Sequence, residues 1–191
     1  MKKILIGTHN KGKFREIAYL ISKKYKKISP ISLKIKSPVE TGKSFDANSR
    51  LKAIFFSKNV NFPVISDDSG LCVKSLNNKP GIYSARLAKK CGGFSNAMKY
   101  ILRKIKNKKN RSAYFVCSLT YKEEKKIITV KGKVSGQISK KISGKNGFGY
   151  DSIFIPNNHK LTYGQMSKLK KIKMDHRYIA FKKLKRKINT L

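Results

Sequence analysis

The spacing of apolar residues changes within the first 21 residues, and this change constrains the fold more than any other feature. Residues 3–8 form a short, mostly apolar run that is typical of a buried strand. After a polar turn, Phe14, Ile17, Ala18 and Ile21 recur at the spacing of one helical face. The chain is therefore predicted to begin with a strand, a turn and a helix.

The same alternation of strand and helix patterns continues to the end of the chain. Strands are predicted around 28–35 and at 63–66, and a hairpin at 113–121 and 127–134. Helices are predicted after Ser44, from Ser95 and after Asp175. The apolar faces expected for the first two of these helices are Ala47, Leu51, Ile54 and Phe55, and Ala97, Met98, Ile101, Leu102 and Ile105. The mixture predicts an α/β fold, a central sheet flanked by helices, in a single domain over 1–191.

The formal net charge of +37, from 46 basic and 9 acidic side chains, would by itself suggest a nucleic-acid partner. However, the lysines are spread through almost every segment and form no single arm or stripe. This spread favours codon drift over selected binding, so we predict no specific nucleic-acid partner. Small anions should be attracted in either case.

The sequence carries no signal for export or for a membrane. Its first residues lack the features of a secretory signal, and no run approaches the ~18 apolar residues of a transmembrane helix. Cys72, Cys91 and Cys117 form no CxxC pair, which argues against a disulfide framework or a structural zinc site. We therefore expect a soluble, cytoplasmic protein with no membrane partner.

The scarce acidic residues are candidates for function, above all Asp67 and Asp68. They follow a short apolar run, so they are predicted to lie at the carboxyl end of a strand, where ligand crevices open in α/β sheets. Adjacent strand residues point to opposite faces, so only one of the two should face a given cleft. Asp68 with Glu40 would suit Mg²⁺, although a turn capped by aspartate is an equally good interpretation of this motif alone.

The polar turn at 8–13 suits a triphosphate. It offers a hydroxyl, an amide, two ammonium groups and the N–H groups of a helix N-terminus. Its members are Thr8, His9, Asn10, Lys11, Gly12 and Lys13. It is not a Walker A loop, because the GxxxxGK[ST] spacing is absent, and a basic helix start without a ligand is the alternative.

A second group of residues suits a purine. In Gly147-Phe148-Gly149-Tyr150-Asp151, two glycines allow a tight turn that presents a ring, so Phe148 or Tyr150 could stack on a base while the other packs in the core. Near the C-terminus, Lys171, His176 and Arg177 could donate to a purine O6. For the turn the alternative is packing alone, and for the basic residues it is structural salt bridges.

In order and spacing, these motifs resemble the inosine triphosphate pyrophosphatase family, which includes the dITP/XTP pyrophosphatases and is also called HAM1-like. The resemblance covers nearly the whole chain and rests on five blocks. They are THNKGKFRE at 8–16, ETGKSFDANSRLKA at 40–53, ISDDSGLCVKSLNNKPGIYSAR at 65–86, GKNGFGYDSIF at 144–154 and DHR at 175–177.

The resemblance implies a magnesium-dependent enzyme that cuts ITP, dITP or XTP to the monophosphate and pyrophosphate, and so clears deaminated purines from the nucleotide pool. It implies that Glu40 and Asp68 hold Mg²⁺, with Asp68 also accepting the proton of the attacking water. The substrate residues that it implies are Thr8, His9, Asn10, Lys11, Gly12, Lys13, Ser69, Phe148, Gly149, Tyr150, Asp151, Lys171, His176 and Arg177.

The resemblance further implies a twisted mixed sheet split into two lobes with a central substrate cleft, and a homodimer. Gln165, Asp175 and Ser152 depart from the family's usual residues, and all three lie on the side of the chain predicted to read the base. A related pyrophosphatase of the Maf type is the rival enzyme, against which the DDSGL and GFGYD blocks count.

Overall fold

The structure is a computed structural model that describes residues 1–188. Its strands are β1 (Lys2–Ile6), β2 (Tyr25–Ile28), β3 (Val64–Val73), β4 (Lys79–Pro80), β5 (Ser112–Glu123), β6 (Lys126–Ile138) and β7 (Phe154–Pro156). Its α-helices are α1 (Lys11–Leu20), α2 (Phe45–Ser57), α3 (Ser84–Lys90), α4 (Phe94–Lys104), α5 (Lys168–Ile172) and α6 (His176–Lys185). Within these residues no helix combines the length and apolar character needed to cross a bilayer.

The seven strands form one mixed sheet in the order β2-β1-β3-β5-β6-β7, with β4 paired to β3. β1 runs parallel to β2 and to β3, whereas the pairs β3–β4 and β6–β7 are antiparallel. The predicted hairpin is confirmed, since β5 and β6 are joined by a short turn at 124–125. A sheet of this kind with helices packed on it confirms the predicted α/β class.

The chain divides into two compact units. Unit 1 comprises Met1–Asp68, Cys117–Gly132 and Arg177–Leu191, of which residues up to 188 are described. Unit 2 comprises Ser69–Val116 and Lys133–His176. The boundaries fall inside β3, β5 and β6, so each of these strands contributes residues to both units.

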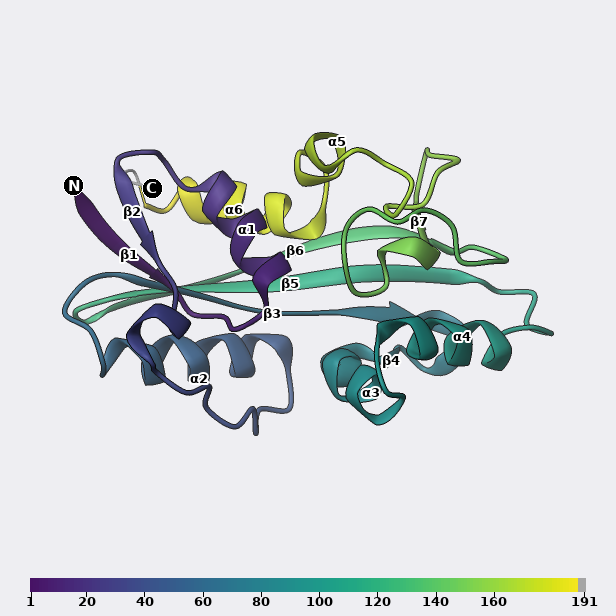
Figure 1. Cartoon of the computed structure of the whole chain (residues 1–191), viewed down its shortest axis with the longest axis horizontal. Helices are drawn as coiled ribbons and strands as arrows, with labels where there is room; N and C mark the ends of the chain where they lie inside the picture. Colours follow the sequence, from purple (N-terminus) through teal and green to yellow (C-terminus); the bar gives the residue numbers. More distant parts are fainter. Residues whose placement is uncertain (189–191) are drawn as a thin grey trace. The chain divides into compact units, whose positions relative to one another are not determined.

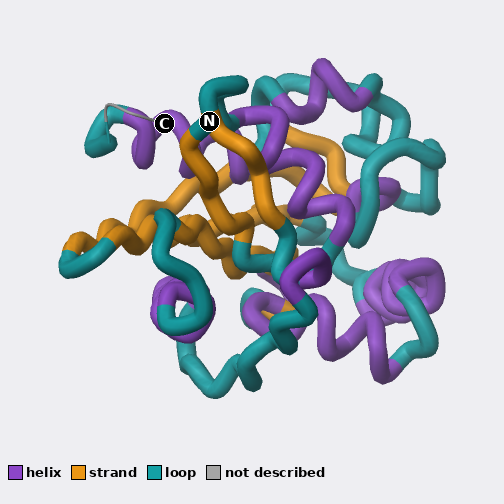
Figure 2. The backbone as a smooth tube through the Cα atoms, turned by 60° about the vertical axis from the view of Figure 1, so that its left-hand side comes forward, coloured by secondary structure: helices purple, strands orange, loops and turns teal. Residues whose placement is uncertain are grey.

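In unit 1 the sheet is covered by α2 on one face and by α1 and α6 on the other (Figures 1 and 2). The alternation of β1 divides its buried residues accordingly. Ile4 and Ile6 pack in one core with Ile17 of α1 and Phe181 of α6, and Leu5 packs in another with residues of α2. The predicted first strand and helix are confirmed.

In unit 2 a single core joins β3, α4, β5 and the segment after β7. Ala97, Met98 and Ile101 form the buried face of α4, as their spacing predicts. Phe115 of β5 packs edge-on against Phe154, with ring centroids 4.8 Å apart. Aromatic rings of β5 and β7 therefore form part of this core, together with the apolar side chains of α4.

Two local predictions are wrong. The second strand ends at Ile28, and part of the predicted segment forms a 3₁₀ helix, η1 (Ile31–Leu33), instead. In α2 the buried residues are Asn48, Ser49, Lys52, Ala53 and Phe56, not the predicted apolar face. Apolar spacing misses this helix because its inward face is largely polar.

Candidate functional site

Strand β3 runs straight through the aspartate pair. The prediction that the strand ends before Asp67 is therefore wrong, because β3 continues to Val73 and both carboxylates are buried in its middle. The predicted alternation does hold. Ile65 packs on the side of α1 and α6 and Val64 on the side of α2, so Asp67 and Asp68 face these two sides in turn.

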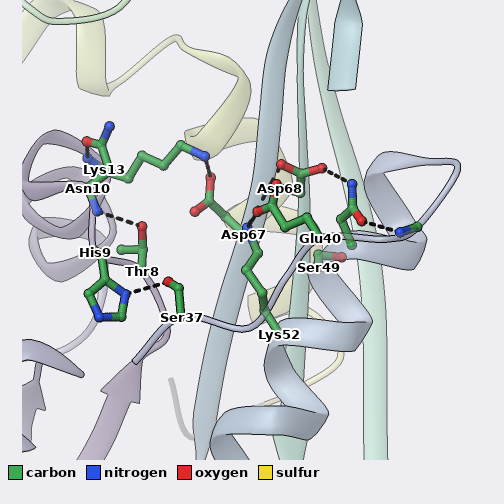
Figure 3. Close-up of polar contacts among 12 residues, drawn as sticks. Thr8, His9, Asn10, Lys13, Ser37, Glu40, Ser49, Lys52, Asp67 and Asp68 are labelled. Atoms are coloured by element: carbon green, nitrogen blue, oxygen red, sulfur yellow. Dashed lines mark hydrogen bonds and ion pairs between the residues drawn. The ribbon is translucent and has the colours of Figure 1, made fainter. Parts of the chain in front are cut away.

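Asp67 contacts two cations on the side of α1 and α6, Lys13 and Arg177, and Figure 3 shows the first of them. Its Oδ2 lies 3.2 Å from Lys13 Nζ and 3.6 Å from Arg177 Nε, and Arg177 Nη1 also lies 2.5 Å from Glu16 Oε2. Burial alone would raise the pKa of Asp67, but the charges of Lys13, Arg177 and Lys52 outweigh it and hold this pKa at about 2. Asp67 is therefore ionised, and its ion pair holds the ammonium group of Lys13 in place.

Asp68 lies in a different electrostatic environment, on the side of α2. Its Oδ2 accepts a 3.1 Å hydrogen bond from Asn48 Nδ2, and its Oδ1 lies 3.9 Å from Lys52 Nζ. Burial raises the pKa of Asp68 and the nearby Glu40 carboxylate raises it too, against the opposing pull of Lys52 and Lys13. A carboxylate with a raised pKa is a better proton acceptor than an ordinary aspartate.

Lys52 connects Asp68 to Glu40. Its buried ammonium donates a 2.6 Å hydrogen bond to Glu40 Oε1. Burial lowers the pKa of Lys52, but the charges of Asp67, Asp68 and Glu40 raise it by more. The net pKa of Lys52 is therefore above its ordinary value. Lys52 therefore remains a cation among the carboxylates.

Asn48 and Lys52 are site residues that the sequence reasoning missed. Asn48 is fully buried, and its Oδ1 accepts the 2.8 Å bond of Gly42 N while its Nδ2 binds Asp68. The two residues are four apart and so share one face of α2. The available signal was this pair of polar residues at helical spacing, inside the block that carries the family resemblance.

Glu40 and Asp68 fit a magnesium ion. Because one ammonium group contacts both carboxylates, they face each other closely enough to serve one cation. Residues 1–188 contain no group of three or more His, Cys, Asp or Glu side chains that could hold a metal. A pair suffices for Mg²⁺, which usually keeps water and substrate phosphates as its other ligands.

The predicted triphosphate turn forms the N-terminus of α1. Asn10 is the N-cap residue, and its Oδ1 accepts the 3.0 Å bond of Lys13 N, while Thr8 Oγ1 accepts a 3.2 Å bond from Asn10 N. Lys11 and Gly12 occupy the first turn of the helix. A pocket of about 540 Å³ adjoins this turn and is lined in part by Thr8, His9, Asn10 and Lys11. Amides and cations gathered at a helix N-terminus favour an anion.

In unit 2 three of the predicted purine residues, Phe148, Asp151 and Lys171, form a second cluster. Lys171 Nζ lies 2.6 Å from Asp151 Oδ2 and 4.7 Å from the centroid of the half-buried Phe148 ring. The same Asp151 oxygen accepts a 2.8 Å bond from Phe148 N. A side chain at Gly147, which has φ +76, would place its Cβ 2.1 Å from this oxygen, so the turn requires glycine here.

The other predicted purine residues lie in varied settings. Tyr150 is buried and donates a 2.8 Å hydrogen bond to Ser84 O, as a core residue would, while Gly149 is half-buried beside it. His176 is buried and stacks on Phe115, with centroids 4.8 Å apart and planes at 8°. Arg177 belongs to unit 1 and contacts Glu16 and Asp67, as described above.

Ser69 and the three departures from the family pattern are also placed. Ser69 follows Asp68 in β3 and is half-buried. Gln165 Oε1 accepts a 3.1 Å bond from Thr162 N, Ser152 Oγ donates to Gly144 O at 2.9 Å, and Asp175 is fully buried just before α6. Gln165 and Ser152 thus hold the loops on either side of β7.

Comparisons with known proteins identify the family of the chain. The model of the Ham1 family matches residues 4–187. A Dictyoglomus thermophilum protein named dITP/XTP pyrophosphatase is 38% identical over 190 residues, covering 95% of this chain and 92% of the relative. A protein of the same name from Borreliella burgdorferi (strain ZS7) is 39% identical over 196 residues, covering 97% of this chain and 96% of the relative.

Solved structures show the same fold. The Staphylococcus aureus Ham1 protein superposes with a TM-score of 0.87 at 35% identity, covering 98% of each chain. A HAM1 protein from Coxiella burnetii gives a TM-score of 0.87 at 28% identity over the whole of both chains. The resemblance drawn from the sequence is confirmed, and the chain belongs to the Ham1 family.

Proposed function

We propose that this protein is a magnesium-dependent pyrophosphatase that converts dITP, XTP and ITP to the monophosphate and pyrophosphate, and so clears deaminated purines from the nucleotide pool. The relatives that share more than a third of its residues are named dITP/XTP pyrophosphatases. The observation that carries the proposal is the placement of Asp68, buried on β3 against Asn48 and facing Glu40 across Lys52.

The proposed reaction begins with proton transfer to Asp68. A water held by this carboxylate gives up its proton and attacks the α-phosphorus, and the bond to the bridging oxygen breaks to release pyrophosphate. Mg²⁺, held by Glu40 and Asp68, would neutralise the phosphate oxygens when bound. Lys13 and the amides at the start of α1 would stabilise the charge of the leaving pyrophosphate.

We propose that the cluster in unit 2 recognises the purine. Phe148 offers a half-buried ring for stacking, and Lys171 lies beside it as a donor for a 6-oxo group. Adenine carries an amino donor at that place and would meet a like donor. A role for His176 and Arg177 in donating to the purine O6 stays a prediction. Equal rates on ITP and ATP would contradict it.

The test is the release of pyrophosphate from ITP, dITP, XTP, GTP and ATP at one concentration, with Mg²⁺ and with excess chelator. We expect fast release from the first three alone, abolished by the chelator. Release of orthophosphate in place of pyrophosphate, or equal rates on all five, would contradict the proposal. The family resemblance also supports a cytoplasmic homodimer, for which light scattering should give twice the mass of the chain.

A further inference from the structure

Glu40 lies in a stretch of chain that has little structure of its own. Between η1 and α2, residues 34–44 form no helix or strand. Side chains of α2 hold the far part of this stretch, since Lys52 binds Glu40 and Asn48 binds Gly42 N. A metal ligand on such a segment needs a further anchor on its near side, because loose ligands weaken metal binding.

His9 supplies contacts on that near side. Its Nε2 lies 2.9 Å from Ile35 O, and its Nδ1 lies 2.6 Å from Ser37 Oγ (Figure 3). A carbonyl oxygen can only accept, so Nε2 is the donor to Ile35, and in the neutral ring Nδ1 accepts the hydroxyl proton of Ser37. Both ring nitrogens are therefore used by the segment 35–37.

These bonds join two parts of the chain that are 26 and 28 residues apart. On one side lies the turn that carries Thr8, Asn10 and Lys13, and on the other lies the segment that leads to Glu40. The imidazole also lies against Phe56 of α2, with ring centroids 6.2 Å apart. The ring thus links the groups proposed to bind the triphosphate to the stretch that carries a proposed metal ligand.

We propose that His9 is a positioning residue, which holds the segment 35–40 against the triphosphate turn and thereby keeps Glu40 in place for Mg²⁺. The family resemblance implied a direct role in substrate binding for this position. The contacts of its ring support an indirect role instead. This inference rests on the proposed function for its consequences in catalysis, but the link itself is independent of it.

The link is tested first without metal or substrate, by hydrogen–deuterium exchange in full-length protein. His9→Ala and Ser37→Ala should each speed exchange in peptides covering 34–42 by about tenfold, with little change in the core strands. His9→Gln, whose amide can still donate to Ile35 O, should lie between these variants and the wild type. The matched controls are His159→Ala in unit 2 and Ser32→Ala, whose hydroxyl in η1 donates only locally, to Ser29 O.

The second readout separates metal binding from substrate binding. Both variants should raise the Mg²⁺ concentration for half-maximal rate by roughly tenfold, the low end for loss of a residue that supports a metal ligand. The KM for dITP at saturating Mg²⁺ should change by less than about twofold, because the substrate contacts remain. Binding of Mn²⁺ to the free protein, followed by electron paramagnetic resonance, should weaken in parallel.

Two results would overturn the proposal. One is unchanged exchange at 34–42 in both variants. The other is a raised KM at saturating Mg²⁺ in His9→Ala while Ser37→Ala behaves as wild type, which would show direct substrate contact. Exchange decides the link even if the wild-type protein proved inactive, a result that would count against the proposed function instead.

Discussion

Two adjacent aspartates of one strand are given different chemistry by the residues that they face. Asp67 meets Lys13 and Arg177, and its pKa is held at about 2. Asp68 accepts a hydrogen bond from Asn48, and its distance of 3.9 Å to Lys52 is longer than the 3.2 Å between Asp67 and Lys13. Burial leaves the pKa of Asp68 raised. Alternation along β3 thus separates an anchor that is charged at neutral pH from a candidate base.

The role of Asp68 predicts a large loss of rate on substitution. Asp68→Asn keeps the size of the side chain but removes the proton acceptor, so kcat should fall by about 10²- to 10⁴-fold. Circular dichroism should show an unchanged fold. The control Asp46→Asn alters a partly exposed carboxylate that pairs with Lys131, and it should keep the wild-type rate. A folded Asp68→Asn protein within tenfold of wild type would refute the assignment.

The lowered pKa of Asp67 predicts a loss of stability in acid. Because its pKa is about 2 in the folded protein and 3.8 ordinarily, its contribution is complete above about pH 4 and is lost as the pH falls towards 2. The loss should be on the order of 2 kcal/mol. Urea unfolding between pH 5 and 2.5 would show it. Asp67→Asn should be less stable at neutral pH and should lose less on acidification, and parallel curves would contradict this account.

At the scale of elements, helices and strands with regular apolar spacing could be predicted from the sequence, whereas elements that bury polar side chains could not. The strand and helix at the start, α4 and the β5–β6 hairpin follow from apolar spacing. The buried face of α2 could not be found this way, because Asn48, Ser49 and Lys52 point into the protein. The full length of β3 could not be predicted either, because buried aspartates are uncommon in strands. Those of β3 lie beside cations.

Because the buried face of α2 is polar, replacing Asn48 should lower the stability of the protein more than replacing an exposed asparagine. Asn48→Ala removes the buried hydrogen-bond partner of Gly42 N and one of the buried partners of Asp68, and it should lower the free energy of unfolding by about 2 kcal/mol. The matched change Asn59→Ala, just beyond the same helix, removes an exposed bond to Phe55 O and should cost less than about 1 kcal/mol. Equal costs in denaturant titrations would show that the buried bonds contribute nothing special.

At the scale of the whole molecule, the positive charge has two separate parts. Most basic side chains are exposed, whereas Lys52, Lys171 and Arg177 are buried, each beside a carboxylate. The buried three belong to the candidate sites in units 1 and 2. The exposed excess, within a net +37, produces a field that should draw in anionic substrates.

This field predicts a rate that depends on salt. Raising KCl from 50 to 300 mM at fixed free Mg²⁺ should lower kcat/KM for dITP several-fold, because screening weakens attraction before contact. The value of kcat should change little, since the bound substrate is screened less. A kcat/KM that does not vary with salt would mean that the charge has no part in capture.

The central claim, attack of an Asp68-activated water on the α-phosphorus, is tested most directly by the fate of that water's oxygen. Hydrolysis of dITP in H₂¹⁸O should place the label in the nucleoside monophosphate and leave pyrophosphate unlabelled. Attack on the β-phosphorus gives the same two products with the label in pyrophosphate. Mass spectrometry of the products separates the two, and labelled pyrophosphate would contradict the mechanism proposed for this site.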